Sequence, residues 1–120
     1  MNSEELKIRT KQFALRVMKL VGALLRTTIG RAIGGQLVRC GTSVGANYRA
    51  ACRSRSKAEF SAKLGTVEEE ADETCFWLEL IIESTLLPAK RVAALLDEAN
   101  ALTAIFTSAV KTSKYGRDHG

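Results

Sequence analysis

Hydrophobic residues recur along this chain at intervals of three and four positions in four successive stretches. This spacing places apolar side chains on one face of an α-helix. No stretch shows the alternation of a half-buried strand, so the pattern predicts an all-α protein. The four apolar series are Phe13, Val17, Leu20, Val21 and Leu24; Ile33, Leu37, Cys40, Val44 and Tyr48 or Ala51; Phe60, Leu64, Val67, Ala71, Thr74, Leu78, Ile81 and Ile82; and Val92, Leu95, Leu96, Ala99, Leu102, Ile105, Phe106, Ala109 and Val110.

Local signals set the expected helix boundaries. Ser56 and Glu59 form a capping box, in which Ser56 accepts a bond from the amide of Glu59 and Glu59 reaches back to the amide of Ser56. We also expect Thr28 to cap the second helix and Pro88 to lie in the first turn of the fourth. Helices over about 4–26, 28–53, 57–84 and 88–114, joined by short connections, predict an antiparallel up-down-up-down four-helix bundle over residues 1–114. Residues 115–120 are expected to form a disordered tail.

The second predicted helix contains an unusual number of glycines. An interior glycine costs roughly 0.5–1 kcal/mol relative to alanine, so a group of them implies that another element packs closely on the backbone. The alternative is that the first two mark a loop and the helix begins later. The glycines concerned are Gly34, Gly35, Gly41 and Gly45.

The third predicted helix is apolar nearly all round between Cys75 and Ile82. Leu78, Ile81 and Ile82 supply the single stripe that a bundle helix needs. The helix is therefore wedged between two neighbours, or it meets a second copy of the chain, and we favour a homo-oligomer with Trp77 as the anchor of the contact. The residues assigned to this contact are Phe76, Trp77 and Leu80.

Charge is divided unevenly over the chain. The net charge of +5 is the sum of +10 over residues 1–57 and −5 over residues 58–120. Arg49 and Arg53 lie four positions apart, with Arg39 expected on nearly the same side, and arginines that share a helix face can follow a phosphate backbone. The alternatives are pairing with the acidic third helix and plain solvation. The candidate nucleic-acid-binding residues are Arg16, Lys19, Arg39, Arg49, Arg53, Arg55 and Lys57.

Little in the sequence indicates catalysis or a cofactor. Three cysteines do not make a disulfide framework and are expected to be buried thiols of a reducing compartment. The only histidine is His119, and no histidine follows the acids at 68–73 at the spacing of a di-metal bundle site. We therefore expect no metal, no cofactor and no enzyme activity.

No apolar run reaches the roughly 18 residues of a membrane span, and the chain lacks a signal-peptide pattern, which predicts a cytoplasmic protein without membrane contact.

Several motifs resemble one known family. They are residues 36–50, Gln-Leu-Val-Arg-Cys-Gly-Thr-Ser-Val-Gly-Ala-Asn-Tyr-Arg-Ala; 53–60, Arg-Ser-Arg-Ser-Lys-Ala-Glu-Phe, with Lys63 and Leu64; and 67–74, Val-Glu-Glu-Glu-Ala-Asp-Glu-Thr, followed by Trp-Leu-Glu-Leu at 77–80. The chain resembles the four-helix-bundle proteins of 23S rRNA intervening sequences over about residues 6–114. It departs from them after Asn47, where Tyr48-Arg49-Ala50-Ala51 replaces an Ile-Ala-Glu-Gly-like ending.

The resemblance implies a barrel-shaped homopentamer. Relatives include accessory proteins of diversity-generating retroelements, in which a basic ring binds nucleic acid and a reverse transcriptase. We interpret Ser43 and Asn47, four positions apart, as a structural pair that hydrogen-bonds to a neighbouring helix, rather than as a ligand site.

Two functions follow from these patterns. The leading hypothesis is a non-enzymatic homo-oligomeric scaffold whose basic surface contacts RNA or DNA. The alternative is a protein-binding adaptor that docks another chain through the apolar patch near Trp77.

Overall fold

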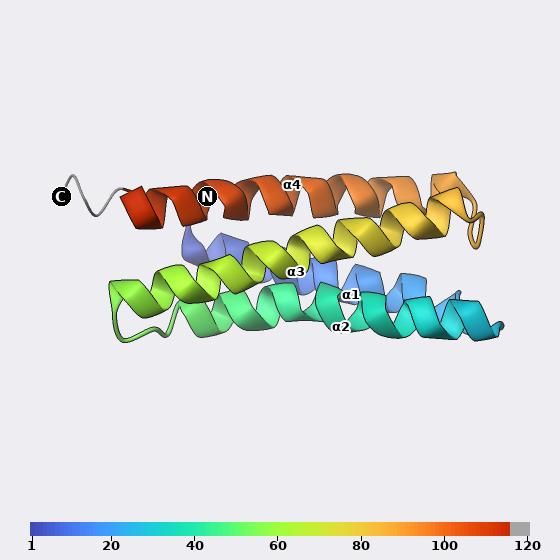
Figure 1. Ribbon diagram of the computed structural model, residues 1–120, viewed down its shortest axis with the longest axis horizontal. Coiled ribbons are helices and arrows are strands. Elements are labelled where there is room, and N and C mark those ends of the chain that lie inside the picture. Colours follow the sequence, from blue (N-terminus) through green and yellow to red (C-terminus); the bar gives the residue numbers. More distant parts are fainter. Residues whose placement is uncertain (116–120) are drawn as a thin grey trace.

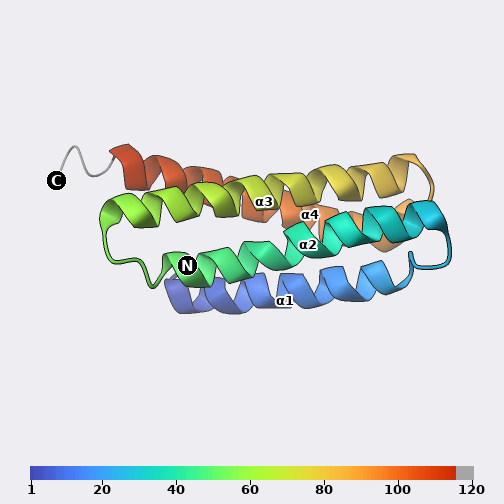
Figure 2. The same ribbon diagram turned by 60° about the horizontal axis from the view of Figure 1, so that its bottom comes forward.

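The computed structural model describes residues 1–115, which form an elongated bundle of four helices. The helices are α1 (Ser3–Gly22), α2 (Thr28–Ala51), α3 (Lys57–Glu83) and α4 (Ala89–Tyr115). Each helix runs opposite to the one before it (Figures 1 and 2). α2 packs on α1 and α3, α4 packs on α3, and α1 touches α4 only sparsely. The predicted up-down-up-down bundle is confirmed, with α1 and α3 at diagonal corners.

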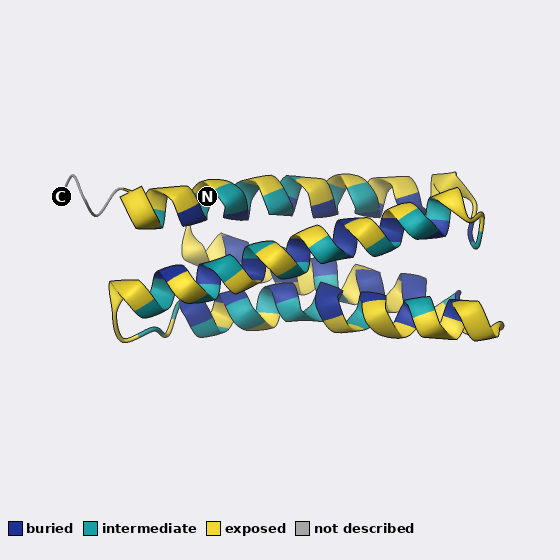
Figure 3. Cartoon of the chain, viewed as in Figure 1, coloured by how far each residue is buried: buried dark blue, intermediate teal, exposed yellow. Residues whose placement is uncertain are grey.

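The core consists of the predicted apolar series. Every residue of the four series is buried or half-buried, and the buried faces point into the bundle (Figure 3). Phe13 and Phe106 are the largest fully buried side chains. The ring of Tyr48 packs on that of Phe106, with the centroids 5.4 Å apart.

Capping side chains begin three of the helices. The prediction for α3 is confirmed, because the Ser56 hydroxyl accepts a hydrogen bond of 3.1 Å from the amide of Glu59. The Glu59 carboxylate, however, accepts from the amide of Arg55 rather than that of Ser56. Thr28 was the wrong cap for α2: Thr27 Oγ1 accepts from the amide of Gly30 at 2.9 Å. Pro88 lies one residue before α4 instead of within its first turn.

The glycines of α2 let α1 approach closely. A Cβ atom at Gly41 would lie 2.8 Å from Val17 Cγ1, and one at Gly34 would lie 3.1 Å from Val21 Cγ1. Gly45 faces the backbone of Thr10 in the same way. The expected close packing is confirmed at these positions, and α2 runs through the positions where a loop was the alternative.

Gly35 and the chain end depart from expectation. A Cβ atom at Gly35 would meet no atom within 4 Å, so close packing does not explain this glycine. Tyr115 belongs to α4 rather than to a tail. The disordered tail predicted for residues 116–120 lies outside the described residues.

Candidate nucleic-acid interface

A basic groove runs between the first half of α1 and the last turns of α2. Its volume is about 440 Å³. The four cations that line it are Lys7, Lys11, Arg49 and Arg53. Lys7 and Lys11 are one helical turn apart on α1, Arg49 is in the last turn of α2 and Arg53 is in the turn that follows it, and the antiparallel packing brings the two pairs together.

Most of these cations have no carboxylate partner. Lys7 pairs with Glu4, which also lines the groove, at 3.0 Å. Within residues 1–115, no carboxylate lies within 4.0 Å of the charged groups of Lys11, Arg49 or Arg53. α2 contains no acidic residue at all. Three of its four cations therefore present positive charge that no carboxylate of the described residues neutralises.

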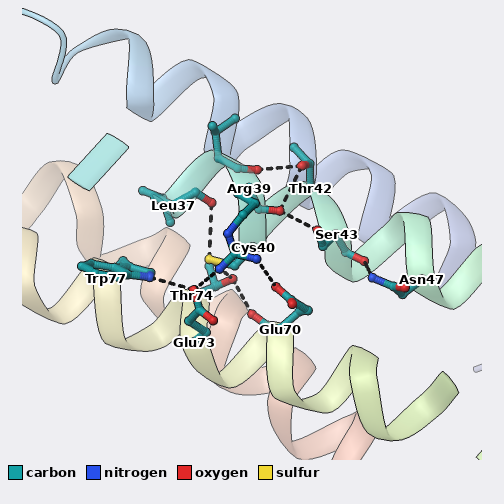
Figure 4. Close-up of polar contacts among 11 residues, drawn as sticks. Leu37, Arg39, Cys40, Thr42, Ser43, Asn47, Glu70, Glu73, Thr74 and Trp77 are labelled. Atoms are coloured by element: carbon teal, nitrogen blue, oxygen red, sulfur yellow. Dashed lines mark hydrogen bonds and ion pairs between the residues drawn. The ribbon is translucent and has the colours of Figure 1, made fainter. Parts of the chain in front are cut away.

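Arg39 does not share this surface, which corrects the expectation that it lies beside Arg49 and Arg53. Its guanidinium points to α3, where it pairs with Glu73 and, at 3.4 Å, with Glu70 (Figure 4). These carboxylates raise the pKa of the Arg39 guanidinium. For this residue, the alternative of pairing with the acidic third helix is the correct one.

The other predicted basic residues lie at two further places. Arg16 and Lys19 line a groove of about 370 Å³ between α1 and α4, together with Arg91. Arg55 and Lys57 are exposed at the connection between α2 and α3, next in the chain to Arg53. The structure thus divides the predicted set into three groups instead of one face.

Lys7 and Lys11 are missing from the predicted set. The signal that finds them is two basic pairs, each four positions apart, at the start of one helix and the end of the next. In an antiparallel helix pair joined by a short turn, these two ends lie side by side.

Ser43 and Asn47 do not bond to a neighbouring helix, contrary to the interpretation of the family motif. The Ser43 hydroxyl donates to the carbonyl of Arg39 at 2.6 Å, and the Asn47 amide donates to the carbonyl of Ser43 at 2.8 Å (Figure 4). Both bonds stay within α2. The close approach of α1 depends on the glycines of this motif instead.

The apolar surplus of α3 is smaller than expected. Trp77 and Leu80 are half-buried, and Trp77 packs against the core while its Nε1 donates to Glu73 at 3.1 Å (Figure 4). Phe76 alone is 51% exposed, and its ring packs edge-on against that of Trp77. α1 carries a second group of exposed apolar residues, which lie outside its predicted apolar series: Ile8, Leu15 and Met18.

Some acidic and thiol groups of α2 and α3 have hydrogen-bond partners within the fold. Thr107 donates to Glu68 at 2.6 Å, and Thr74 donates to the Cys40 thiol at 3.3 Å. Burial raises the pKa of Cys40 and of Cys75, which keeps both thiols protonated at neutral pH. Cys52 is half-buried, and all three cysteines are free. No group of three or more metal-ligating side chains comes together among residues 1–115.

Comparison with known proteins gives the family. The family model of the 23S rRNA-intervening sequence protein matches residues 4–108. This chain belongs to the 23S rRNA-intervening sequence protein family. A crystal structure of a protein of unknown function from the S23 ribosomal protein family of Bacteroides thetaiotaomicron superposes with a TM-score of 0.85 at 30% identity. The similarity covers 93% of this chain and 100% of that one. No curated protein matches the chain.

The motifs of this 23S rRNA-intervening sequence protein thus act mainly within the chain, through glycine contacts and helix caps. Among the described residues, the charged surface of α1 and α2 that has no ion-pair partner is mainly basic. None of the four helices in the described part has an apolar stretch that would span a membrane.

Proposed function

We propose that this member of the family is a non-enzymatic scaffold that binds the backbone of RNA or DNA through the groove between α1 and α2. The observation that carries the proposal is the convergence of Lys11, Arg49 and Arg53, for which residues 1–115 supply no carboxylate partner. Unneutralised cations in a row attract phosphates and release counterions when they bind them. A structure in which these residues were paired, as Arg39 is, would give no such support.

The groove is suited to recognising the shape and charge of a nucleic-acid backbone rather than the sequence of its bases. Lys7, Lys11 and Arg49 stand on helices, Arg53 follows the end of α2, and the exposed Arg55 and Lys57 continue the positive charge along the adjoining connection. Contacts of this kind position a nucleic acid without reading its bases. We therefore expect weak sequence preference and strong dependence on salt.

We also propose that the scaffold acts as an assembly of several copies in the cytoplasm. The family resemblance implies a homopentamer, and exposed apolar side chains on α1 and α3 support self-association. The adaptor alternative, in which a different chain docks on α3, is supported by the exposure of Phe76 alone. A reverse transcriptase as partner remains the expectation for the retroelement branch of the family.

A titration with structured RNA at several salt concentrations tests the nucleic-acid proposal. Arg49→Gln with Arg53→Gln removes two charges from the groove. Its matched control, Arg26→Gln with Lys90→Gln, removes two exposed charges at the opposite end of the bundle. We expect the groove variant to weaken binding about tenfold or more and to lower the magnitude of the slope of log K against log salt by about 1.4–1.8, since each phosphate contact contributes roughly 0.7–0.9.

The control variant is expected to stay within about threefold of the wild type. Equal losses in the two variants would mean that net charge, and not this groove, binds the RNA. Absence of binding at low salt would remove the proposal altogether.

A further inference from the structure

The outward face of α1 is apolar and basic. Ile8, Leu15 and Met18 are 58%, 58% and 53% exposed, respectively, which is unusual for large apolar side chains on a bundle helix. Lys11 and Lys19 lie one turn before and one turn after Leu15, and both are exposed. No acidic residue occurs between Leu6 and Gly22. This face therefore combines an apolar stripe with positive charge alone.

The outward face of α3 carries charge opposite to that of the outward face of α1. Phe76 is 51% exposed, and the exposed positions one and two turns away from it are acidic. These acidic neighbours are Glu69, Asp72, Glu79 and Glu83. α3 carries no basic residue beyond Lys63. One chain thus presents two apolar patches with opposite rims of charge.

The two faces lie at the same height along the bundle. Val17 of α1 packs on Gly41 of α2, and the neighbouring Cys40 of α2 accepts a hydrogen bond from Thr74 of α3. α2 therefore places Val17 level with Thr74, and Leu15 and Met18 level with Phe76 to within about one helical turn. α1 and α3 also run in the same direction at diagonal corners, so their outward faces point to different sides of the bundle (Figure 1).

We infer that the α1 face of one copy docks on the α3 face of the next copy, with Leu15 and Met18 against Phe76 and Lys19 against the acids, while Lys11 stays at the edge of the nucleic-acid groove. The inference rests on the proposed self-association and identifies the surfaces that it uses. Such a contact is heterologous, because two different patches meet. Because the two faces lie at the same height, neighbouring copies pack side by side with no translation along the bundle axis. This arrangement favours a closed ring over a helical filament.

A second copy fits the α1 face better than a lipid surface does. A basic amphipathic helix also binds anionic membranes. In this chain, however, an acidic patch of matching height with an aromatic centre is present on the same molecule. Binding to anionic vesicles by the monomeric chain is therefore the competing outcome.

Light scattering on purified variants tests the inference. Leu15→Glu places a carboxylate against the acids of α3, and Phe76→Lys places an ammonium against Lys19 of α1. Both positions are exposed, so circular dichroism is expected to stay helical. Ala104→Glu, at an exposed position of α4, is the matched control and is expected to leave the mass of the assembly unchanged.

The inference predicts that each variant alone has the mass of a single chain. Mixing the two variants is expected to restore a complex of at least two chains, because each variant keeps the face that the other lacks. If only one variant loses assembly, or mixing restores nothing, the contact is not α1 on α3.

Two results separate this inference from the proposal on which it rests. A wild-type assembly that both variants retain would overturn the inference and leave self-association intact. A monomeric wild type at micromolar concentration would overturn both, and loss of binding to phosphatidylserine vesicles in Leu15→Glu would then assign the α1 face to membranes.

Discussion

Gly41 and Gly35 lie in the same helix and meet opposite surroundings. A Cβ atom at Gly41 would come within 2.8–3.2 Å of three atoms of the Val17 side chain, which is itself fully buried. A Cβ atom at Gly35 would point into open space. The same residue type therefore serves packing at one position and weakens the helix without a packing gain at the other.

Alanine substitutions at these glycines are expected to have opposite effects. Gly41→Ala forces α1 away from α2, and such overpacking costs about 1–3 kcal/mol, more than the helix gains from alanine. Gly35→Ala is expected to raise the free energy of unfolding by roughly 0.5–1 kcal/mol, because it removes backbone freedom from the unfolded chain. Urea denaturation of the two variants checks both signs, and a stabilising Gly41→Ala would contradict the close contact.

Of the helix pairs that pack on each other, α1 and α4 touch most sparsely, and one ion pair links them across this seam. Arg9 Nε and Nη2 donate to the two carboxylate oxygens of Glu98, each at 2.7 Å. The Arg9 guanidinium holds the pKa of Glu98 below its ordinary value of 4.5, and Glu98 in turn raises the pKa of Arg9. A forked pair of this kind is stronger than a single-contact surface pair.

The lowered pKa of Glu98 makes the seam sensitive to acid. Because the folded state holds the carboxylate ionised, its stabilising contribution is complete above the unfolded pKa and is lost as the pH falls through the lower folded pKa. Glu98→Gln is expected to lower the free energy of unfolding by about 0.5–2 kcal/mol at pH 7. The difference from the wild type should shrink towards zero between pH 4 and pH 2.

Urea denaturation across this pH range measures the effect, with Asp97→Asn as the control. Asp97 is an exposed neighbour with no basic group within 4.0 Å among residues 1–115. The control is expected to follow the wild type at every pH. A Glu98→Gln variant as stable as the wild type at pH 7 would show that the pair does not hold the seam.

The order, type and cores of the four helices were predictable from the sequence, because apolar spacing and capping side chains are local signals. The Ser56 cap is an example. The prediction that Arg39 lies on nearly the same side as Arg49 is wrong. Helical geometry alone places the two well apart, since ten residues make close to two and three-quarter turns. Its pairing with Glu73 depends on where α3 packs against α2, which the local sequence does not indicate.

Two other features depend on which of several available hydrogen-bond partners or helix faces the folded chain uses. The motif predicts partners on another helix for Ser43 and Asn47, but the carbonyl four residues earlier in their own helix is nearer. Leu15 and Met18 are as hydrophobic as Val17 and Leu20. Only the position of α2 shows which of them face solvent.

For the whole molecule, assembly would repeat the basic groove several times around one particle. A long nucleic acid that engages several grooves gains affinity from effective concentration, whereas a short one that fills a single groove does not. The proposed contact through Leu15 therefore links assembly to binding. Self-association would set the length of nucleic acid that the protein prefers.

Leu15→Glu is accordingly expected to weaken binding of a long RNA by about a hundredfold, as loss of multivalency typically does, while a short oligonucleotide binds as it does to the wild type. Parallel titrations with RNAs of the two lengths measure the ratio, and Ala104→Glu is the control. Equal weakening for both lengths would mean that Leu15 lies in the nucleic-acid contact itself.

The antiparallel order of the helices also places Ser3 and Tyr115 at the same end of the bundle (Figure 1). The groove that includes Lys7 and Arg53 opens at this end. An affinity tag or fluorescent protein fused before α1 would therefore stand beside the groove, which Glu4 and Lys7 line. Fusions inserted at the connections near Arg26 or Thr85, at the far end, would leave the groove open.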